Sequence, residues 1–382
     1  MTVVKLEIEK CASDYLPQGG SNDNTTTIRA FVTPSTVEGK FKFTLFDVSD
    51  EKGYCLNAPT NLPASGEDSD SWKDFQFPSQ TGFTISGSDS NIAETVASDL
   101  NEATVTIKSF DYGSFGKIKA EFTKQDYSFT CIAKETGGIN EYTRLPADSN
   151  SNSIADSWSG DAGPSGNSDA TYDDDNSPTN GYTTGDGLSR YEEYRGFNVN
   201  GNHVRTIPTI KDVFICDVGN AFGSSRDDVG QLGCDTHWIQ SNEWDGASSD
   251  ESPTLQHINF NCESHRGRTY LQRALRIIDG GNDGTSTWGM ALHYLPRCPN
   301  NTIMAVVYTG NINAYWTNSP PSSEVITRTV AHELAHGCGL LDDYSNPGGI
   351  MSEYLEPGSN VWHIFRSGTG EGTLNELRIR YP

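Results

Sequence analysis

Residues 332–342, His-Glu-Leu-Ala-His-Gly-Cys-Gly-Leu-Leu-Asp, place the strongest constraint on how this chain folds. Histidines four residues apart lie on one face of an α-helix, one turn apart, so both imidazoles can bind a single metal ion. Gly339 follows His336 by three residues and suits the end of a helix. The run therefore predicts a helix that extends to His336 and then a turn that brings Asp342 back to the same ion.

The residue types in this run are those of a catalytic zinc site. Zinc in hydrolases takes three protein ligands and leaves a fourth position for water. His332, His336 and Asp342 supply that number, and Asp343 is the alternative third ligand. Zinc lowers the pKa of its water to about 7, and Glu333 lies beside the histidines as the expected general base. The competing interpretation of the two histidines is an ordinary surface helix.

The same run resembles the motif of the metzincin zinc endopeptidases, H-E-x-x-H-x-x-G-x-x-H followed by a methionine turn. Asp342 stands where that pattern has its last histidine, and Gly348-Gly349-Ile350-Met351-Ser352 is similar to the methionine turn. The resemblance covers residues 322–354 closely and residues 200–382 loosely. It implies zinc-dependent cleavage of protein or peptide substrates.

The resemblance also implies roles for two residues after the zinc motif. Met351 would pack beneath the metal without binding it. Some metzincins carry a tyrosine two residues after the methionine that helps to bind the metal or the oxyanion. Tyr354 lies three residues after Met351 and is the catalytic candidate for that role here.

Residues 1–140 are predicted to form an all-β domain, an immunoglobulin-like sandwich. Segments that alternate in polarity are separated by clusters of Gly, Pro, Asn and Ser, as in small antiparallel sandwiches. The domain contains no histidine and no recognisable catalytic residues, so we expect a spacer or a binding module. The predicted strands are residues 3–8, 26–32, 40–46, 103–107 and 117–122.

Residues 141–197 form an acidic segment that favours calcium binding over a flexible linker, the alternative interpretation. Side-chain oxygens at loop positions 1, 3, 5 and 9 and a backbone carbonyl at position 7 are typical of calcium loops. The expected ligands are Asp148, Asn150, Asn152, Ile154 and Asp156, joined by Asp186 and Glu193, with Asp173, Asp174 and Asp175 as further ligands.

Residues 198–382 are predicted to be an α/β metzincin-like catalytic domain, so the whole chain is expected to be multidomain. Apolar runs predict strands at 211–216 and 303–308 and an edge strand at 311–318, to which a peptide substrate would add. Helical spacing predicts helices at 269–278, from Ser322 or Ser323 to His336, and at 374–380.

Charge excludes several classes of partner. The chain carries 27 Lys and Arg against 51 Asp and Glu, a net charge of -24, so nucleic acid and anionic membrane surfaces are unsuitable partners. No apolar run is long enough to span a membrane. Divalent cations such as calcium suit an acidic surface. We expect a monomer.

The eight cysteines include no C-x-x-C pair, so a cysteine zinc site is not expected. Their even number favours disulfide bonds and an extracellular, secreted protein. Cys298 is predicted to be a disulfide partner, and a disulfide at Cys338 would hold the loop that carries Asp342. The first residues, Met1 to Lys5, do not resemble a signal peptide, so we expect either an intracellular chain or a leader already removed.

Three functions are compatible with these features. The first is a secreted, calcium-stabilised zinc endopeptidase. The second is a calcium-dependent surface or adhesion protein whose zinc site is vestigial. The third is a zinc hydrolase that acts on other substrates. The intact Glu333 argues against the second, and the resemblance favours peptide bonds over the third.

Overall fold

The computed structural model describes the chain in two compact units. Unit 1 comprises Met1–Tyr172 and Arg190–Phe197, and unit 2 comprises Asp173–Ser189 and Asn198–Pro382. The acidic segment 141–197 is therefore shared between the two units. The described residues are 4–19, 24–51, 54–56, 73–135, 138–163, 166–173, 175–177, 185–241, 243, 275–293, 302–316, 321–342 and 349–352.

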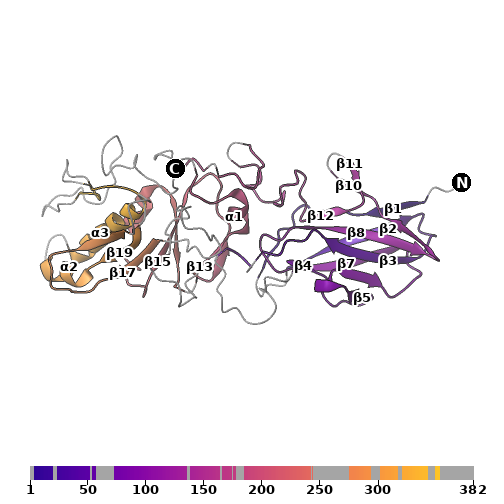
Figure 1. Ribbon diagram of the computed structural model, residues 1–382, viewed down its shortest axis with the longest axis horizontal. Coiled ribbons are helices and arrows are strands. Elements are labelled where there is room, and N and C mark those ends of the chain that lie inside the picture. The colour runs from indigo at the N-terminus through magenta and orange to yellow at the C-terminus, as the bar shows by residue number, and fades with distance from the viewer. Residues whose placement is uncertain are drawn as a thin grey trace. The chain divides into compact units, whose positions relative to one another are not determined.

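Unit 1 contains two larger antiparallel sheets and one small hairpin (Figure 1). One sheet has the order β1 (Lys5–Ile8), β2 (Thr25–Thr33), β7 (Glu102–Ser109) and β4 (Phe75–Gln76). The other has the order β12 (Thr143–Leu145), β8 (Gly116–Lys124), β3 (Lys40–Phe46), β6 (Ile92–Thr95) and β5 (Phe83–Ser86), and β9 (Tyr127–Thr130) pairs with β8. The remaining elements are the β10–β11 hairpin (Ala133–Glu135, Gly138–Asn140), η1 (Ser88–Ser90) and α1 (Arg190–Arg195).

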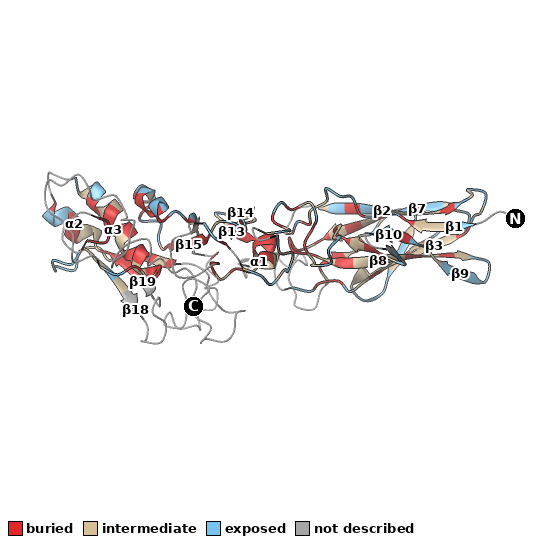
Figure 2. Ribbon diagram, turned by 90° about the horizontal axis from the view of Figure 1, so that it is seen from above, coloured by how far each residue is buried: buried red, intermediate tan, exposed pale blue. Residues whose placement is uncertain are grey.

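Alternation along the strands places the core of unit 1 between its sheets, as in a sandwich. Phe41, Phe43 and Leu45 of β3 are at most 1% exposed, while the residues between them are only partly buried. Figure 2 shows this alternation of buried and exposed positions along the strands. Each fully buried side chain of this size contributes about 1.5–3 kcal/mol, so the alternation fixes which face of each strand turns inward.

Unit 2 is built on a five-stranded sheet with the order β16, β15, β17, β19, β18. The first four strands run parallel, and β18 is an antiparallel edge strand. Their bounds are β15 (Asp212–Asp217), β16 (Asp235–Ile239), β17 (Leu275–Asp279), β18 (Gly289–His293) and β19 (Thr302–Val307). The unit also contains η2 (Asp227–Leu232), α2 (Thr309–Tyr315) and α3 (Ser322–Gly337), and the short strands β13 (Phe197–Val199) and β14 (Asn202–Val204) pair with each other.

Helix α3 lies against this sheet through an apolar stripe. Val325, Val330 and Leu334 are fully buried and belong to the same core as residues of β15, β17 and β19. The helix begins at Ser322, one of the two predicted starts, and the extended Pro321 precedes its first turn. It ends at Gly337, and Gly339 then adopts a φ of 83°, which glycine tolerates without strain. The chain therefore turns sharply just before Asp342.

The prediction of a C-terminal α/β metzincin-like catalytic domain is wrong. The described part of the chain is 15% helical and mostly β-sheet, with sandwich-like sheets, and its α-helices are α3 and the short α1 and α2. The described part of the predicted helix 269–278 is strand β17, and the predicted edge strand 311–318 begins as helix α2. Short apolar runs fit both periodicities, and pairing of β17 with β15 and β19 decides in favour of a strand.

No helix among the described residues is long and apolar enough to cross a membrane, in agreement with the absence of a long apolar run. The predicted helix at 374–380 lies outside the described residues.

Candidate metal centre

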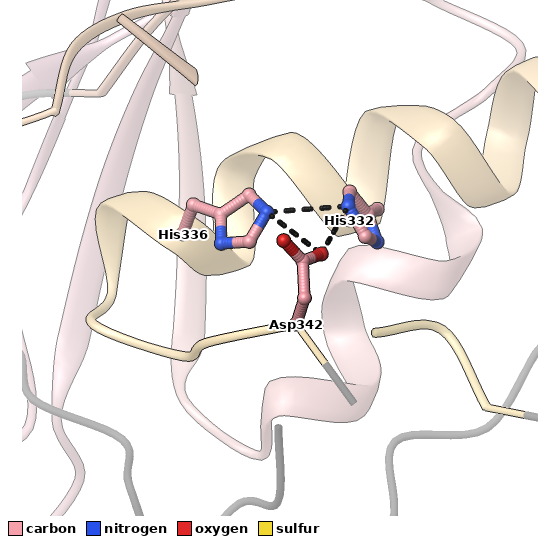
Figure 3. A group of neighbouring side chains, drawn as sticks. All are labelled: His332, His336 and Asp342. Carbon is pink, nitrogen blue, oxygen red and sulfur yellow. Dashed lines mark hydrogen bonds and ion pairs between the residues drawn. The ribbon is translucent and has the colours of Figure 1, made fainter. Parts of the chain in front are cut away.

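The side chains of His332, His336 and Asp342 point toward one another at the end of α3 (Figure 3). The two histidines lie one helical turn apart, and the turn at Gly339 returns Asp342 to them. The Nε2 atoms of the histidines are 3.2 Å apart, and Asp342 Oδ1 lies 3.3 Å from His332 Nε2 and 3.5 Å from His336 Nε2. These three atoms form a nearly equilateral triangle.

The size of this triangle suits a zinc ion. Ligand atoms about 2.0–2.2 Å from a tetrahedral zinc lie roughly 3.3–3.6 Å from one another. The observed separations of 3.2 to 3.5 Å are close to that range. Two imidazoles and one carboxylate are also a ligand set that zinc hydrolases use. The residues present therefore fit zinc with little rearrangement.

Backbone carbonyls hold both imidazoles in the orientation that metal binding needs. His332 Nδ1 lies 2.8 Å from the carbonyl oxygen of Ile350, and His336 Nδ1 lies 2.7 Å from that of Leu340. When Nδ1 carries the proton and donates it to a carbonyl, Nε2 keeps its lone pair for a metal. The turn that follows α3 thus favours this tautomer for His336, and the segment around Met351 favours it for His332.

The charges of this group stabilise one another. Burial opposes ionisation of Asp342, but hydrogen bonds to His332 and His336 outweigh it and lower the pKa of Asp342 below its usual value. Burial likewise works against protonation of His336, but the hydrogen bond to Asp342 and nearby acids raise its pKa. An anionic carboxylate is therefore present beside the imidazoles at neutral pH, as a metal ligand must be.

Glu333 lies beside this triangle in a nearly closed environment. It is 5% exposed, and its Oε1 lies 3.9 Å from His332 Nε2. Burial raises the pKa of Glu333, which moves it toward the range in which a carboxylate exchanges protons at neutral pH. Gly289 of β18 packs directly against its side chain, where no Cβ atom would fit.

A cleft of about 620 Å³ opens over these residues. The edge strand β18 forms one wall through residues 289–291, and α3 with its following turn forms the other. Arg328 and Ser352 also line it. A cleft of this size can hold a few residues of an extended chain between β18, the last described strand of the sheet, and the candidate metal centre.

Of the other residues predicted for this site, Met351 lies among the described residues, whereas Asp343 and Tyr354 do not. Met351 is 1% exposed and belongs to the core of unit 2. It follows Ile350, whose carbonyl oxygen is hydrogen-bonded to Nδ1 of His332. Tyr354 and Asp343 lie outside the described residues, and their roles stay predictions.

The predicted calcium loop 148–156 has its oxygens directed at its own backbone. Asp148 accepts hydrogen bonds from the amides of residues 151, 152 and 153, and Asp156 accepts one from Ser149. Asn150 and Asn152 donate to Asp161, and the side chain of Ile154 is fully buried. No described group of three acidic, imidazole or thiol ligands includes Asp148 or Asp156.

The remaining predicted calcium ligands lie in different units. Glu193 belongs to α1 of unit 1 and is 2% exposed. Asp186 belongs to unit 2, where ligand atoms of Asp173, Asp175 and Asp186 lie within 4.8 Å of one another. Burial, followed by the charges of neighbouring aspartates, raises the pKa of Asp186 well above its usual value. Asp174 lies outside the described residues.

The described cysteines form no disulfide bond. Cys11, Cys55, Cys131, Cys216, Cys234 and Cys338 are all buried thiols. Burial raises the pKa of Cys338 to about 12, so its thiol is protonated at neutral pH. Cys262 and Cys298 lie outside the described residues, so the pairing predicted for Cys298 stays a prediction.

Three features of unit 2 did not emerge from sequence patterns. Gly289 and Arg328 line the cleft from positions that no motif marks. Asp212, Asp235 and His237 form a third group with ligand atoms within 4.8 Å, at the start of neighbouring parallel strands. Only the pairing of β15 with β16 brings these last three together, and the spacing of Asp235 and His237 two residues apart in β16 was the only local signal for them.

Comparison with known proteins identifies no family for this chain. No protein-family model matches it, and no curated protein sequence matches it. Among solved structures, a human F-spondin reeler domain has a TM-score of 0.23 at 12% identity, covering 38% of this chain and 93% of that one. The Reelin-N domain of F-spondin has a TM-score of 0.22 at 12% identity, covering 36% and 83%. Likenesses of this size indicate no function.

Proposed function

We propose that this chain is a zinc-dependent endopeptidase that hydrolyses peptide bonds in protein or peptide substrates. The observation that carries the proposal is the triangle of His332, His336 and Asp342, whose ligand atoms lie 3.2 to 3.5 Å apart. The buried Glu333 beside this triangle and the resemblance of residues 332–342 to the metzincin motif support peptide hydrolysis. The proposal concerns the site and not the fold of that family.

His332, His336 and Asp342 would hold the zinc ion, which supplies Lewis acidity toward the scissile carbonyl and makes a water molecule more acidic. Glu333 would accept a proton from the attacking water and deliver it to the leaving amine. Its low exposure and its raised pKa both favour this exchange near neutral pH.

Strand β18 is the element that supports binding of an extended substrate. It is the last strand in the sheet order, runs antiparallel to β19 and borders the cleft. An extended peptide that pairs with the outer edge of β18 would pass Gly289 and lie beside Glu333. This places the substrate at a strand different from the segment 311–318 favoured by the sequence.

Calcium binding belongs to the same proposal, with Asp173, Asp175 and Asp186 as the ligands. Asp175 and Asp186 are 1% and 0% exposed, and a divalent cation would relieve the repulsion between these buried carboxylates. The proposal includes an extracellular setting, where calcium is abundant, for a monomeric enzyme. The acidic composition supports this setting.

The test compares the parent chain with Glu333→Gln, using a disordered protein as substrate and measuring zinc content in both. Glu324→Gln is the matched control, because Glu324 is an exposed glutamate in the first turn of the same helix. We expect cleavage by the parent and the control only, with equal zinc in all three. Zinc binding without cleavage by the parent would contradict the proposed activity.

A further inference from the structure

Arg328 is a buried cation in the wall of the cleft. It lies on α3 one turn before His332 and is 4% exposed. Its Nη2 atom donates to the carbonyl oxygens of Gly349, at 3.3 Å, and Ser352. These bonds attach the turn around Met351 to the helix, but both acceptors are neutral.

The guanidinium of Arg328 is only partly satisfied by these two bonds. Its buried Nε atom has no hydrogen-bond partner, and no ion pair joins Arg328 to a carboxylate among the described residues. Burial lowers the pKa of Arg328 to about 10, so the side chain stays charged at neutral pH. A buried charge without a paired anion is costly, and proteins keep such groups mainly where a ligand completes them.

The nearby acids belong largely to the candidate metal centre. The charges of Glu333, Asp342 and Asp228 act on Arg328 over distances longer than an ion pair. Once a divalent ion binds to Asp342, the ion offsets the negative charge of the centre. The positive charge of Arg328 is then the least compensated charge in the wall of the cleft.

We infer that Arg328 binds a carboxylate of the substrate and makes the enzyme prefer an acidic residue adjacent to the scissile bond. The inference rests on the proposed peptidase function. A guanidinium offers several N–H donors in a planar fork, which matches the two oxygens of a carboxylate. One helical turn, about 5.4 Å, separates Arg328 from the metal ligand His332, a distance that one substrate side chain can span.

The carboxylate can come from an Asp or Glu side chain or from the free C-terminus of a peptide. Cleavage of a mixed peptide library by the zinc-loaded full chain first locates the preferred sequence. Two matched pairs then separate the sources, one with Glu exchanged for Gln beside the scissile bond and one with a free C-terminus exchanged for an amide. We expect kcat/KM to favour the Glu peptide about tenfold, equivalent to about 1.4 kcal/mol, with little effect of the amide.

Variants then assign the preference to Arg328. In Arg328→Gln the Glu-to-Gln ratio should fall to near one, and Arg328→Lys should restore part of it. Arg226→Gln is the matched control, because Arg226 pairs with Asp217 and stacks over Trp238 away from the residues that line the cleft. It should leave the ratio unchanged.

Binding provides a readout that does not depend on turnover. Fluorescence anisotropy with the zinc-loaded Glu333→Gln chain should show the same preference for the Glu peptide, lost when Arg328→Gln is added. Cleavage or binding by the parent without any Glu preference overturns the inference and leaves the peptidase standing, even if Arg328→Gln does not fold. A parent chain that neither cleaves nor binds any peptide overturns both.

Discussion

Gly289 of β18 packs so closely against Glu333 that a Cβ atom at position 289 would lie 2.7 Å from Cγ and Cδ of the glutamate. Real Cβ atoms do not approach other heavy atoms this closely, so the absence of a side chain at Gly289 leaves the room that the Glu333 side chain occupies between α3 and β18. The space available to the Glu333 carboxylate therefore depends on a residue 44 positions away from it in the sequence.

Gly289→Ala should lower kcat/KM by about 10- to 100-fold, because a shift of about 1 Å in a catalytic group has an effect of that order. The zinc content should stay unchanged, since the three atoms nearest to a Cβ atom at position 289 all belong to Glu333, which is not a candidate ligand. Gly230→Ala is the control, because a Cβ atom at Gly230 meets nothing within 4 Å. Equal activity of both alanine variants would show that Glu333 tolerates displacement.

Asp342→Asn should weaken zinc binding at least about tenfold, because a neutral amide is a poorer ligand than a carboxylate. Asp342→His should keep zinc, since it restores a third imidazole. Competition with a chromogenic chelator measures both affinities. Asp343→Asn should bind zinc like the parent, and a loss of zinc in that variant instead of Asp342→Asn would assign the third ligand to Asp343.

Because Asp74 of unit 1 is a buried carboxylate, we expect the free energy of unfolding to depend on pH. Burial, with repulsion from Asp111, raises the pKa of Asp74 to about 7. The folded state therefore keeps this proton to higher pH than the unfolded chain, and its stabilising effect is lost as pH rises through about 7.

The side chain of the Asp74→Asn variant stays neutral at every pH. The free energy of unfolding of this variant, relative to that of the parent, should therefore be higher at pH 8 than at pH 5 by on the order of 1 kcal/mol. Urea unfolding of the full chain at both pH values measures this difference. Asp50→Asn, at an exposed carboxylate paired with Lys73, is the control and should show no such trend. A pH-independent difference for Asp74→Asn would mean that the carboxylate ionises normally.

Calcium should raise the melting temperature of the parent, because a ligand bound only to the folded state at 100 times its Kd adds about 2.7 kcal/mol. Asp186→Asn should abolish most of this gain. Asp148→Asn should retain it, since Asp148 directs its oxygens at the amides of its own loop. Thermal scans with calcium, with magnesium and with a chelator measure this gain in each variant. If only Asp148→Asn loses the calcium-induced rise in melting temperature, the calcium site is the 148–156 loop instead.

The residue spacing of 332–342 was sufficient to predict helix α3, the approach of two imidazoles and the return of Asp342, because helical geometry and a glycine-mediated stop are local properties. Strands β1, β2, β3, β7 and β8 of unit 1 followed from alternation, since one buried face leaves a period of two in the sequence, whereas its other described strands were not predicted. These features need only neighbouring residues.

Tertiary structure decided the rest. Leu275–Asp279 became a strand because β15 and β19 pair with it, although its apolar spacing also suited a helix. The wall formed by Gly289 and the buried charge of Arg328 both depend on contacts between segments far apart in sequence. Side-chain packing sets those contacts, and no local pattern encodes which distant backbone will face a given residue.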